Sequence, residues 1–563
     1  MQGLGTRRMA ALAIFSLLAA AVLLLRLAMV QLWRGRALAA AAVAQRAVVY
    51  PLGLPRGEIY DRKLRSLTDG YRRISAVLFP HLVKDPRQAV DQIARVLRRP
   101  RQEVEALVSP GKGGEGRGSL RLAENLDPFT ARRLESLGIA GLVVAEERVR
   151  YGPGALATHL VGYLEAPNRG VAGLEKGYDD YLRGEMPEAV ASMVDAGGRA
   201  ITGLGYRYRR PLPDALPYDL VLTIDAGIQA LVEEVMDRRV RKGAVVVADA
   251  RSGDILAMAS RPNFDPERVA DFREDDGGAP LWNRAVKDFP PGSTFKLVVA
   301  AAALEEGVAR PESRFFCPGF IDVGLQRIRG WCYERGGHGE LNFRDALAHS
   351  SNPVFIQVGL RLGADRLLQY ARLFGLGTRV LGMEGGPGLP EESPGHLPLN
   401  ARGLLPGDVA NLSIGQGSIT ATPLQMAQVV QAIANDGVLV PLRLARELRT
   451  PYGLVARKFP RSDGRRVISR TTAGELRDAL LAGTTYGTGR AAQVPVFGAG
   501  GKTGTAETGR STAAGEDIAH AWFVGFAPAY YPLYVASVFV EEGMSGAAAA
   551  APVFREIMDG LLR

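Results

Sequence analysis

An unbroken apolar segment from Leu297 to Leu304 places the strongest constraint on how this chain folds. Its composition predicts a helix that is apolar on every side, and such a helix is stable only when other elements bury it completely. The run Pro290–Gly292 disfavours helix just before the segment, and Gly307 is a stop signal just after it. The pattern therefore predicts a buried central helix with Ser293 at its first turn.

Ser293 and Lys296 are spaced for nucleophilic chemistry. Unpaired backbone N–H groups at a helix start favour a developing oxyanion by about 0.3–1 kcal/mol. Lys296 lies three residues on, so its side chain falls on the same face of the helix. It can act as a base only if burial and neighbours lower its pKa from about 10.4, and an apolar helix supplies such surroundings. Taken alone, Ser-x-x-Lys favours the plainer interpretation of an N-capping serine and a surface lysine.

The N-terminus contains a candidate membrane segment. Residues Met9 to Leu25 carry no charge, and the apolar character resumes after Arg26 as far as Trp33. At about 1.5 Å per residue this length spans a bilayer, with Arg26 close enough to the end to reach the interface. The alternative is a secretory signal cleaved near Ala37–Ala39. We expect a retained anchor, with everything after it on one side of the membrane.

Composition narrows the remaining options. A chain of 563 residues predicts two or three domains, and its net charge of +10 is spread along the sequence without a nucleic-acid reader motif. We therefore expect no nucleic-acid partner. Cys317 and Cys332 flank a predicted hairpin, and either a disulfide or two buried thiols fits this placement. The six histidines lack metal-ligand spacing, so we expect no metal and no cofactor.

Two further short patterns accompany Ser293 and Lys296. Ser350-Ser351-Asn352 follows a short amphipathic helix, and Lys502-Thr503-Gly504-Thr505 precedes a pair of predicted strands. A phosphate-binding loop ending at Lys502 is disfavoured, because the glycine it requires is replaced by Val496. Strands near residues 219–224, 243–259 and 521–540, with helices between them, predict an antiparallel sheet covered by helices, an α+β fold.

The order Ser-x-x-Lys, Ser-x-Asn, Lys-Thr-Gly resembles that of penicillin-binding proteins and serine β-lactamases. Stretches outside these motifs are similar to class B penicillin-binding proteins, and the resemblance covers nearly the whole chain. These stretches are Arg56–Arg62, Ala157–Tyr163, Gly173–Glu175 and Gly415–Gly417.

The resemblance implies three parts. We expect a short cytoplasmic tail and transmembrane anchor over residues 1–36 and an N-terminal α+β pedestal, similar to a dimerisation module, over residues 37–217. Residues 218–563 would form a transpeptidase domain of the penicillin-binding and β-lactamase-like fold.

The resemblance also implies roles for the first two motifs. Ser293 would attack the penultimate D-alanine carbonyl of a peptidoglycan stem peptide and form an acyl-enzyme. Lys296 would take its proton, and Ser350 would relay that proton to the leaving amine. Asn352 would hold Lys296 and the substrate amide in register.

The third motif would bind the substrate. Lys502 and Thr503 would hold the terminal carboxylate, and Gly504 would let the strand lie close to the peptide backbone. The backbone N–H groups of Ser293 and Thr505 would form the oxyanion hole.

The implied function is a peptidoglycan D,D-transpeptidase, a target of β-lactams, held in the cytoplasmic membrane with its catalytic domain outside. Similar proteins also imply a partner among the SEDS-family glycan polymerases. Three alternatives share the motifs: a serine β-lactamase, a D,D-carboxypeptidase that uses water as acceptor, and a non-catalytic morphogenetic scaffold that activates a polymerase.

Overall fold

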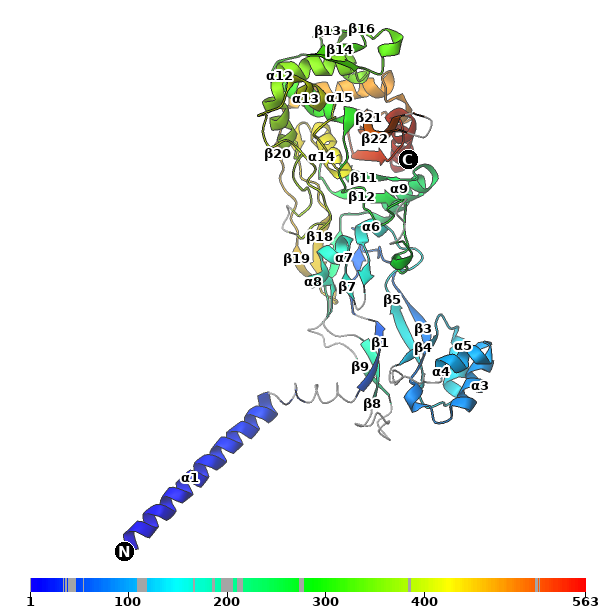
Figure 1. Ribbon diagram of the computed structural model, residues 1–563, viewed down its shortest axis with the longest axis vertical. Coiled ribbons are helices and arrows are strands. Elements are labelled where there is room, and N and C mark those ends of the chain that lie inside the picture. Colours follow the sequence, from blue (N-terminus) through cyan, green and yellow to red (C-terminus); the bar gives the residue numbers. More distant parts are fainter. Residues whose placement is uncertain are drawn as a thin grey trace. The chain divides into compact units, whose positions relative to one another are not determined.

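A computed structural model describes most of the chain. The described residues are 2–33, 35, 38, 47–53, 55–108, 119–165, 168–184, 188–193, 206–209, 216–272, 278–382, 386–511, 515 and 517–563. The chain divides into two compact units (Figure 1). Unit 1 comprises Met1–Pro55, Tyr71–Val149 and Glu185–Ala215, and unit 2 comprises Arg56–Gly70, Arg150–Gly184 and Leu216–Arg563. Because these segments interleave, the single boundary expected after residue 217 stays a prediction.

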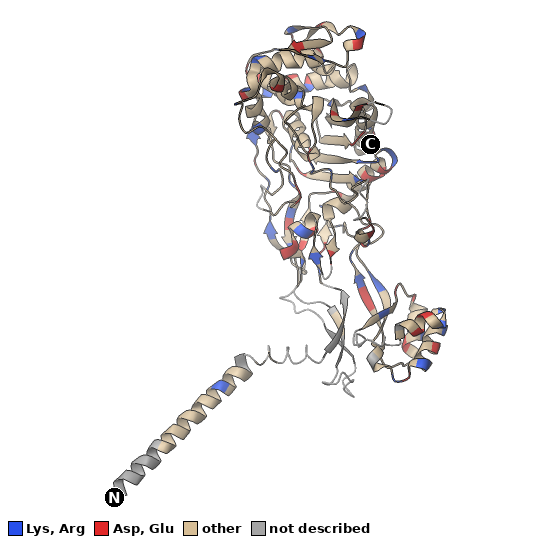
Figure 2. Cartoon of the chain, in the orientation of Figure 1, with Lys and Arg blue, Asp and Glu red and all other residues tan. Residues whose placement is uncertain are grey.

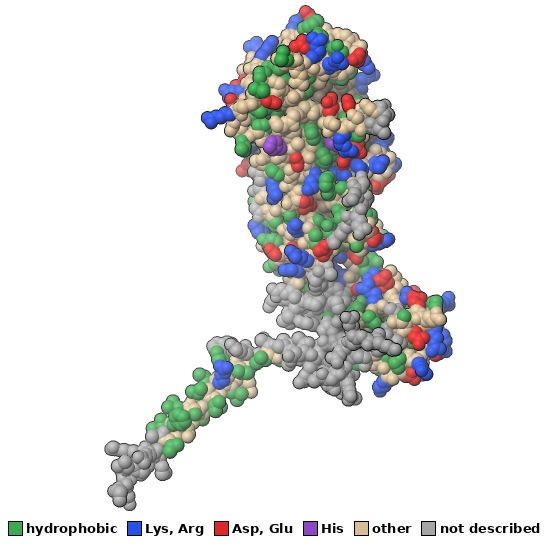
Figure 3. Space-filling view, in the orientation of Figure 1, with side chains coloured by type: hydrophobic (Ala, Val, Ile, Leu, Met, Phe, Trp, Pro, Cys, Tyr) green, Lys and Arg blue, Asp and Glu red, His purple; other side chains and the backbone are tan. Residues whose placement is uncertain are grey.

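The N-terminal helix α1 (Gln2–Ala28) continues into a π-helical turn, η1 (Met29–Trp33). The stretch Leu12–Gln31 is long and apolar enough to cross a membrane, and Arg26 is its only charged residue (Figure 2). Its large side chains are exposed along the helix, where they form an apolar rod (Figure 3). A helix of this length with exposed apolar side chains fits the hydrocarbon core of a bilayer. Ala37 and Ala39, at the alternative cleavage site, lie outside the described residues.

The described part of unit 1 contains two small antiparallel sheets. The strand order β4-β3-β5 forms one, and β1-β8-β9 forms the other. Apolar side chains of α3, α4 and α5 form a core with β3 and β4. Asp85 accepts a hydrogen bond from the Gln88 N–H at the start of α3. The bounds are β1 Ala47–Gly53, β3 Tyr71–Leu78, α3 Pro86–Leu97, α4 Arg101–Val108, β4 Leu120–Ala123, α5 Pro128–Ser136, β5 Leu142–Val149, β8 Glu188–Met193 and β9 Tyr206–Arg209.

Unit 2 is built on a five-stranded antiparallel sheet in the order β12-β11-β23-β22-β21. Alternate residues of β11 enter different cores: Val246 packs with α10 and α14, whereas Val247 packs with α9 and α16. The sheet is therefore buried on both faces, and the predicted helix-covered antiparallel sheet is confirmed (Figure 1). The bounds are α9 Ala226–Arg239, β11 Gly243–Asp249, β12 Ile255–Arg261, α10 Lys296–Glu305, α14 Pro423–Ala434, β21 Gly500–Ser511, β22 Asp517–Ala527, β23 Tyr534–Val540 and α16 Ala551–Leu562.

Helix α10 is the buried central helix that the sequence predicts. Each side chain from Lys296 to Ala303 is buried, and Gly307 adopts the left-handed conformation just beyond its end. The structure differs from the prediction at the start of this helix. Ser293 belongs to a short 3-10 turn, η5 (Gly292–Phe295), and Lys296 is the first α-helical residue.

The other elements of unit 2 surround this framework. A four-stranded sheet β19-β18-β10-β2 holds the early segment against the later chain, through parallel pairing of Ile59 with Leu220. Their bounds are β2 Ile59–Tyr60, α6 Thr158–Val161, β6 Leu164–Glu165, β7 Arg169–Gly170, α7 Gly173–Gly177, α8 Asp179–Leu182, β10 Asp219–Leu222, β13 Arg314–Cys317, β14 Phe320–Val323, β15 Gln326–Arg329, β16 Gly339–Asn342, α11 Phe343–Ala348, α12 Asn352–Leu373, α13 Pro406–Ser413, β17 Val438–Leu439, β18 Ala445–Arg449, β19 Val455–Lys458, β20 Arg465–Arg466 and α15 Arg470–Thr485.

A buried ionic cluster ties the Arg56 segment into unit 2. The Arg56 guanidinium pairs with the carboxylate of Glu175 and, at 2.9 Å, with that of Asp179. Arg150 also pairs with Glu175, at 2.8 Å. Arg56 is 3% exposed and Glu175 is fully buried, so these charges satisfy one another away from water.

Candidate active site

The turn that carries Ser293 is held from two sides. The Gly292 N–H donates to the Gly415 carbonyl at 2.9 Å, and the Trp522 indole N–H donates to the Pro290 carbonyl at 3.1 Å. A Cβ on Gly415 would lie 2.0 Å from the Gly292 carbonyl oxygen, so only glycine permits this approach. Ser293 itself is half-buried, which leaves its side chain accessible in a fixed backbone.

Lys296 is the hub of the site. Its Nζ donates to the Ser350 carbonyl at 2.8 Å, to the Ser350 Oγ at 3.3 Å and to the Asn352 Oδ1 at 2.6 Å. The side chain is fully buried, and burial lowers the Lys296 pKa well below its ordinary value, with the positive charge of Lys502 lowering it further. A lysine in these surroundings releases its proton readily and can accept one from a hydroxyl.

The Ser350-Ser351-Asn352 segment joins two helices at a tight corner. Ser350 follows the last turn of α11 and adopts a left-handed backbone with φ of 58°. A non-glycine residue in this region costs about 1–2 kcal/mol, so surrounding contacts must hold it there. Ser351 caps α12 by accepting from the Val354 N–H, and Asn352 begins that helix. The corner thereby aims both Ser350 and Asn352 at Lys296.

Strand β21 brings the third motif against the Ser293 turn. A Cβ on Gly504 would lie 2.9 Å from the Thr294 Cγ2 and 3.1 Å from the Pro291 carbonyl oxygen, which explains why glycine stands there. Thr505 is exposed, whereas Lys502 is 2% exposed and its Nζ donates to the Thr503 carbonyl at 2.9 Å. Burial lowers the Lys502 pKa to about 7.

All eight residues expected from the sequence therefore come from segments that meet in unit 2. Lys296 contacts the Ser350 segment directly, and its pKa responds to the charge of Lys502 on β21. The Ser293 turn packs against β21 at Gly504.

Thr488 is a contact residue that the sequence interpretation missed. Its N–H donates to the Ala348 carbonyl at 3.1 Å, and its hydroxyl shares a 2.7 Å hydrogen bond with that of Thr503. Thr488 thus connects the end of α11, which leads into Ser350, with the Lys502 strand. No motif surrounds it, and the glycines at Gly487 and Gly489 were the only available signal.

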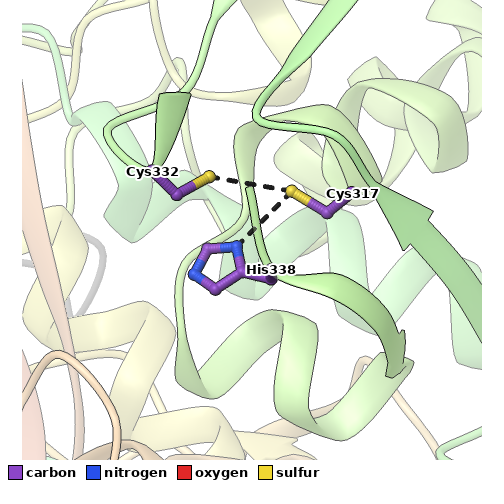
Figure 4. Close-up of side chains that lie close together, drawn as sticks. All are labelled: Cys317, Cys332 and His338. Carbon is purple, nitrogen blue, oxygen red and sulfur yellow. Dashed lines mark hydrogen bonds between the residues drawn. The ribbon is translucent and has the colours of Figure 1, made fainter. Parts of the chain in front are cut away.

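A cluster of possible metal ligands lies beside the Ser350 segment. The Sγ atoms of Cys317 and Cys332 are 3.7 Å apart as free thiols, and the Cys317 Sγ is 3.4 Å from the His338 Nδ1 (Figure 4). The Ser351 hydroxyl donates to the Cys317 Sγ at 3.1 Å. Sequence spacing gave no indication of this group, because His338 joins it only through the fold.

An accessible serine hydroxyl, a buried lysine that readily loses its proton and a second hydroxyl beside it are the components of serine acyl transfer. The similarity of this chain to known protein families supports the same chemistry. Residues 243–559 match the penicillin binding protein transpeptidase domain, and residues 52–208 match the penicillin-binding protein dimerisation domain. The chain therefore belongs to the penicillin-binding proteins, in their class B arrangement, and is an acyl-transferring transpeptidase.

Similar proteins span most of the chain. Stage V sporulation protein D of Bacillus subtilis is 33% identical, over 95% of this chain and 82% of its own length. Peptidoglycan D,D-transpeptidase MrdA of Acinetobacter baumannii is 29% identical, over 95% and 84%. Probable peptidoglycan D,D-transpeptidase PenA of Neisseria gonorrhoeae is 31% identical, over 80% and 74%.

Proposed function

We propose that this protein cross-links peptidoglycan stem peptides through an acyl-enzyme on Ser293. The observation that carries the proposal is the contact set of Lys296, whose buried amine reaches both the Ser350 hydroxyl and the Asn352 amide oxygen. The Ser293 Oγ attacks the carbonyl carbon of the penultimate D-alanine while Lys296 accepts its proton. The peptide C–N bond breaks, and Ser350 relays the proton to the departing D-alanine amine.

The acyl-enzyme then reacts with an amine of a second stem peptide. That amine attacks the ester carbonyl and loses a proton, a new peptide bond forms as the ester C–O bond to Ser293 breaks, and the Ser293 Oγ takes up a proton. Lys502 and Thr503 hold the donor carboxylate, and the backbone N–H groups of Ser293 and Thr505 stabilise the oxyanion of both tetrahedral intermediates. Loss of one such donor costs about 100- to 1000-fold in rate.

The apolar stretch of α1 supports a location at the cytoplasmic membrane, as a single-pass protein with the catalytic unit outside. Stem peptides lie on that side, so the site and its substrate would share a compartment. A SEDS-family glycan polymerase is the proposed membrane partner, since a transpeptidase needs newly made glycan strands.

A donor and acceptor assay tests the function. The full-length protein in detergent is given a peptide ending in D-Ala-D-Ala and an amine acceptor, and products are separated by mass. We expect the cross-linked product from the wild type and from Ser511→Ala, an exposed serine on β21, and none from Ser293→Ala.

The other outcomes identify the alternatives. Release of D-alanine without the cross-linked product would indicate a carboxypeptidase, and rapid turnover of penicillin would indicate a β-lactamase. Cells whose only copy is Ser293→Ala should cross-link their wall poorly, and normal cross-linking in them would favour the scaffold.

A further inference from the structure

We propose that a cavity outside the catalytic site binds the carboxyl end of a short peptide, which is chemically an N-acylated amino acid. The cavity measures about 290 Å³ and lies wholly in unit 2. Its lining comes from the α6–α7 segment, from residues 281–287, which lead towards the Ser293 turn, and from Pro390 and Glu391. Among the described residues that line it, none belongs to the three catalytic motifs.

Two buried polar atoms of the lining have no hydrogen-bond partner in the described part of the chain. Asn283 is 4% exposed, and its Oδ1 accepts from the Ala285 N–H at 3.2 Å, whereas its Nδ2 has no acceptor. The Glu391 Oε1 accepts from the Gly173 N–H at 3.1 Å, whereas its Oε2 has no partner. Because buried polar atoms are costly to leave unpaired, a ligand that pairs with both atoms gains affinity.

The lining has an excess of positive charge. Lys176 and Lys287 both line the cavity, and neither forms an ion pair with a described residue. Burial raises the pKa of Glu391 although both lysines attract its charged form, so this carboxyl keeps its proton more readily than one in water. Burial also lowers the pKa of His159 to about 4, so the imidazole stays neutral. The lysines therefore favour an anionic ligand, and a carboxylate accepts from their amines.

The two unpaired atoms and the size of the cavity define the rest of the ligand. An amide carbonyl can accept from the Asn283 Nδ2, and an amide N–H can donate to the ionised Glu391. When Glu391 is protonated, its hydroxyl can donate to the ligand carboxylate instead. At about 30 Å³ for each water-sized group, the cavity admits about ten non-hydrogen atoms. An N-acylated amino acid fills that space, whereas a carboxylated amino sugar would extend beyond it.

The cavity is open to solvent where the acyl chain of a longer peptide would leave it. Trp282 is 51% exposed, and Lys176 is exposed as well. Phe264 and Leu281 supply apolar surface for the side chain of the bound residue. Peptidoglycan stem peptides end in this chemistry. Naming them as the source of the ligand rests on the proposed function, whereas the binding site itself does not.

Binding is measured by ligand-observed NMR on the full-length protein in detergent. The protein is first treated with penicillin, because the catalytic site would also bind a peptide carboxylate. The probes are the D and L forms of N-acetyl-alanine, their carboxamides and N-acetylmuramic acid. We expect a Kd on the order of 1 mM or tighter for at least one form of N-acetyl-alanine. Its carboxamide, which lacks the negative charge, should bind at least about 10-fold more weakly.

Two variants and a matched control locate the site. Lys287→Gln removes one amine, and Asn283→Asp keeps the acceptor for Ala285 but replaces the unpaired donor with a charged oxygen. Each should weaken binding by at least about 10-fold, whereas Lys458→Gln, at an exposed lysine on β19, should leave it unchanged. Should a variant fail to fold, a photoreactive N-acyl amino acid on the wild type should label residues 171–176 or 281–287.

Four results would overturn the proposal: no binding, equal binding by Lys287→Gln and the wild type, a label confined to other residues, or tighter binding of N-acetylmuramic acid than of either N-acetyl-alanine. Should penicillin fail to react with the protein, the proposed function would fail. The comparison of Lys287→Gln with Lys458→Gln in untreated protein would still test the cavity.

Discussion

Gly292→Ala offers a quantitative test of how tightly the Ser293 turn fits against β21. Gly292 has φ of +55°, and a Cβ there would lie 2.7 Å from the Thr505 carbonyl oxygen. The left-handed backbone alone destabilises an alanine at this position by about 1–2 kcal/mol relative to glycine. The Cβ must also move from 2.7 Å to beyond 3.0 Å from that oxygen, so the turn and the strand separate by at least 0.3 Å.

This separation should slow acylation. A misplacement of about 1 Å costs roughly 100-fold in rate, so 0.3 Å costs about 4-fold as a lower bound. The control is Gly307→Ala. Gly307 has φ of +68° and open space where a Cβ would lie, so this variant carries the same backbone cost without a steric clash. The assay is the rate constant for acylation by a fluorescent penicillin, alongside thermal unfolding of both variants. Equal acylation rates in the two variants would refute the reasoning.

Three further results are expected. Acylation should rise with pH as the buried amine of Lys296 loses its proton, well below 10.5, and substrate binding should weaken above a pH of about 7 as Lys502 becomes neutral. Lys502→Arg should abolish the loss of substrate binding above a pH of about 7, because arginine stays charged. If the acylation rate of the wild type rose only near a pH of 10.5, Lys296 would not be the base. Asn352→Ala removes the 2.6 Å acceptor of Lys296 and should lower the acylation rate by about 10- to 100-fold, measured by stopped flow, whereas an unchanged rate would exclude its role. Arg56→Met should lower the free energy of unfolding by about 3–5 kcal/mol, because it leaves the buried Glu175 carboxylate without one of its partners. Denaturant titration measures this change, and a loss below about 1 kcal/mol would show that the Arg56–Glu175 pair contributes little to stability.

The sequence predicts well what short patterns determine. The central helix follows from the composition of residues 297–304, and Gly307 marks its end. The three short motifs named the candidate residues because their order is specific, even though each is weak alone.

Features that depend on contacts between distant parts of the chain could not be predicted from the sequence. His338 joins the two cysteines only because β13 pairs with β16, and Thr488 connects two motifs through a loop without a signature. The left-handed conformation of Ser350 is equally unpredictable, since serine has no preference for it and the surrounding helices impose it.

The central claim is that Ser293 is the nucleophile, and the most direct measurement is the location of a penicillin adduct. Full-length protein is treated with penicillin, digested, and its peptides are sequenced by mass spectrometry. We expect a single adduct on Ser293 of the wild type, and none on the Ser293→Ala protein. An adduct on Ser350 or another serine, or an equally labelled Ser293→Ala protein, would contradict it.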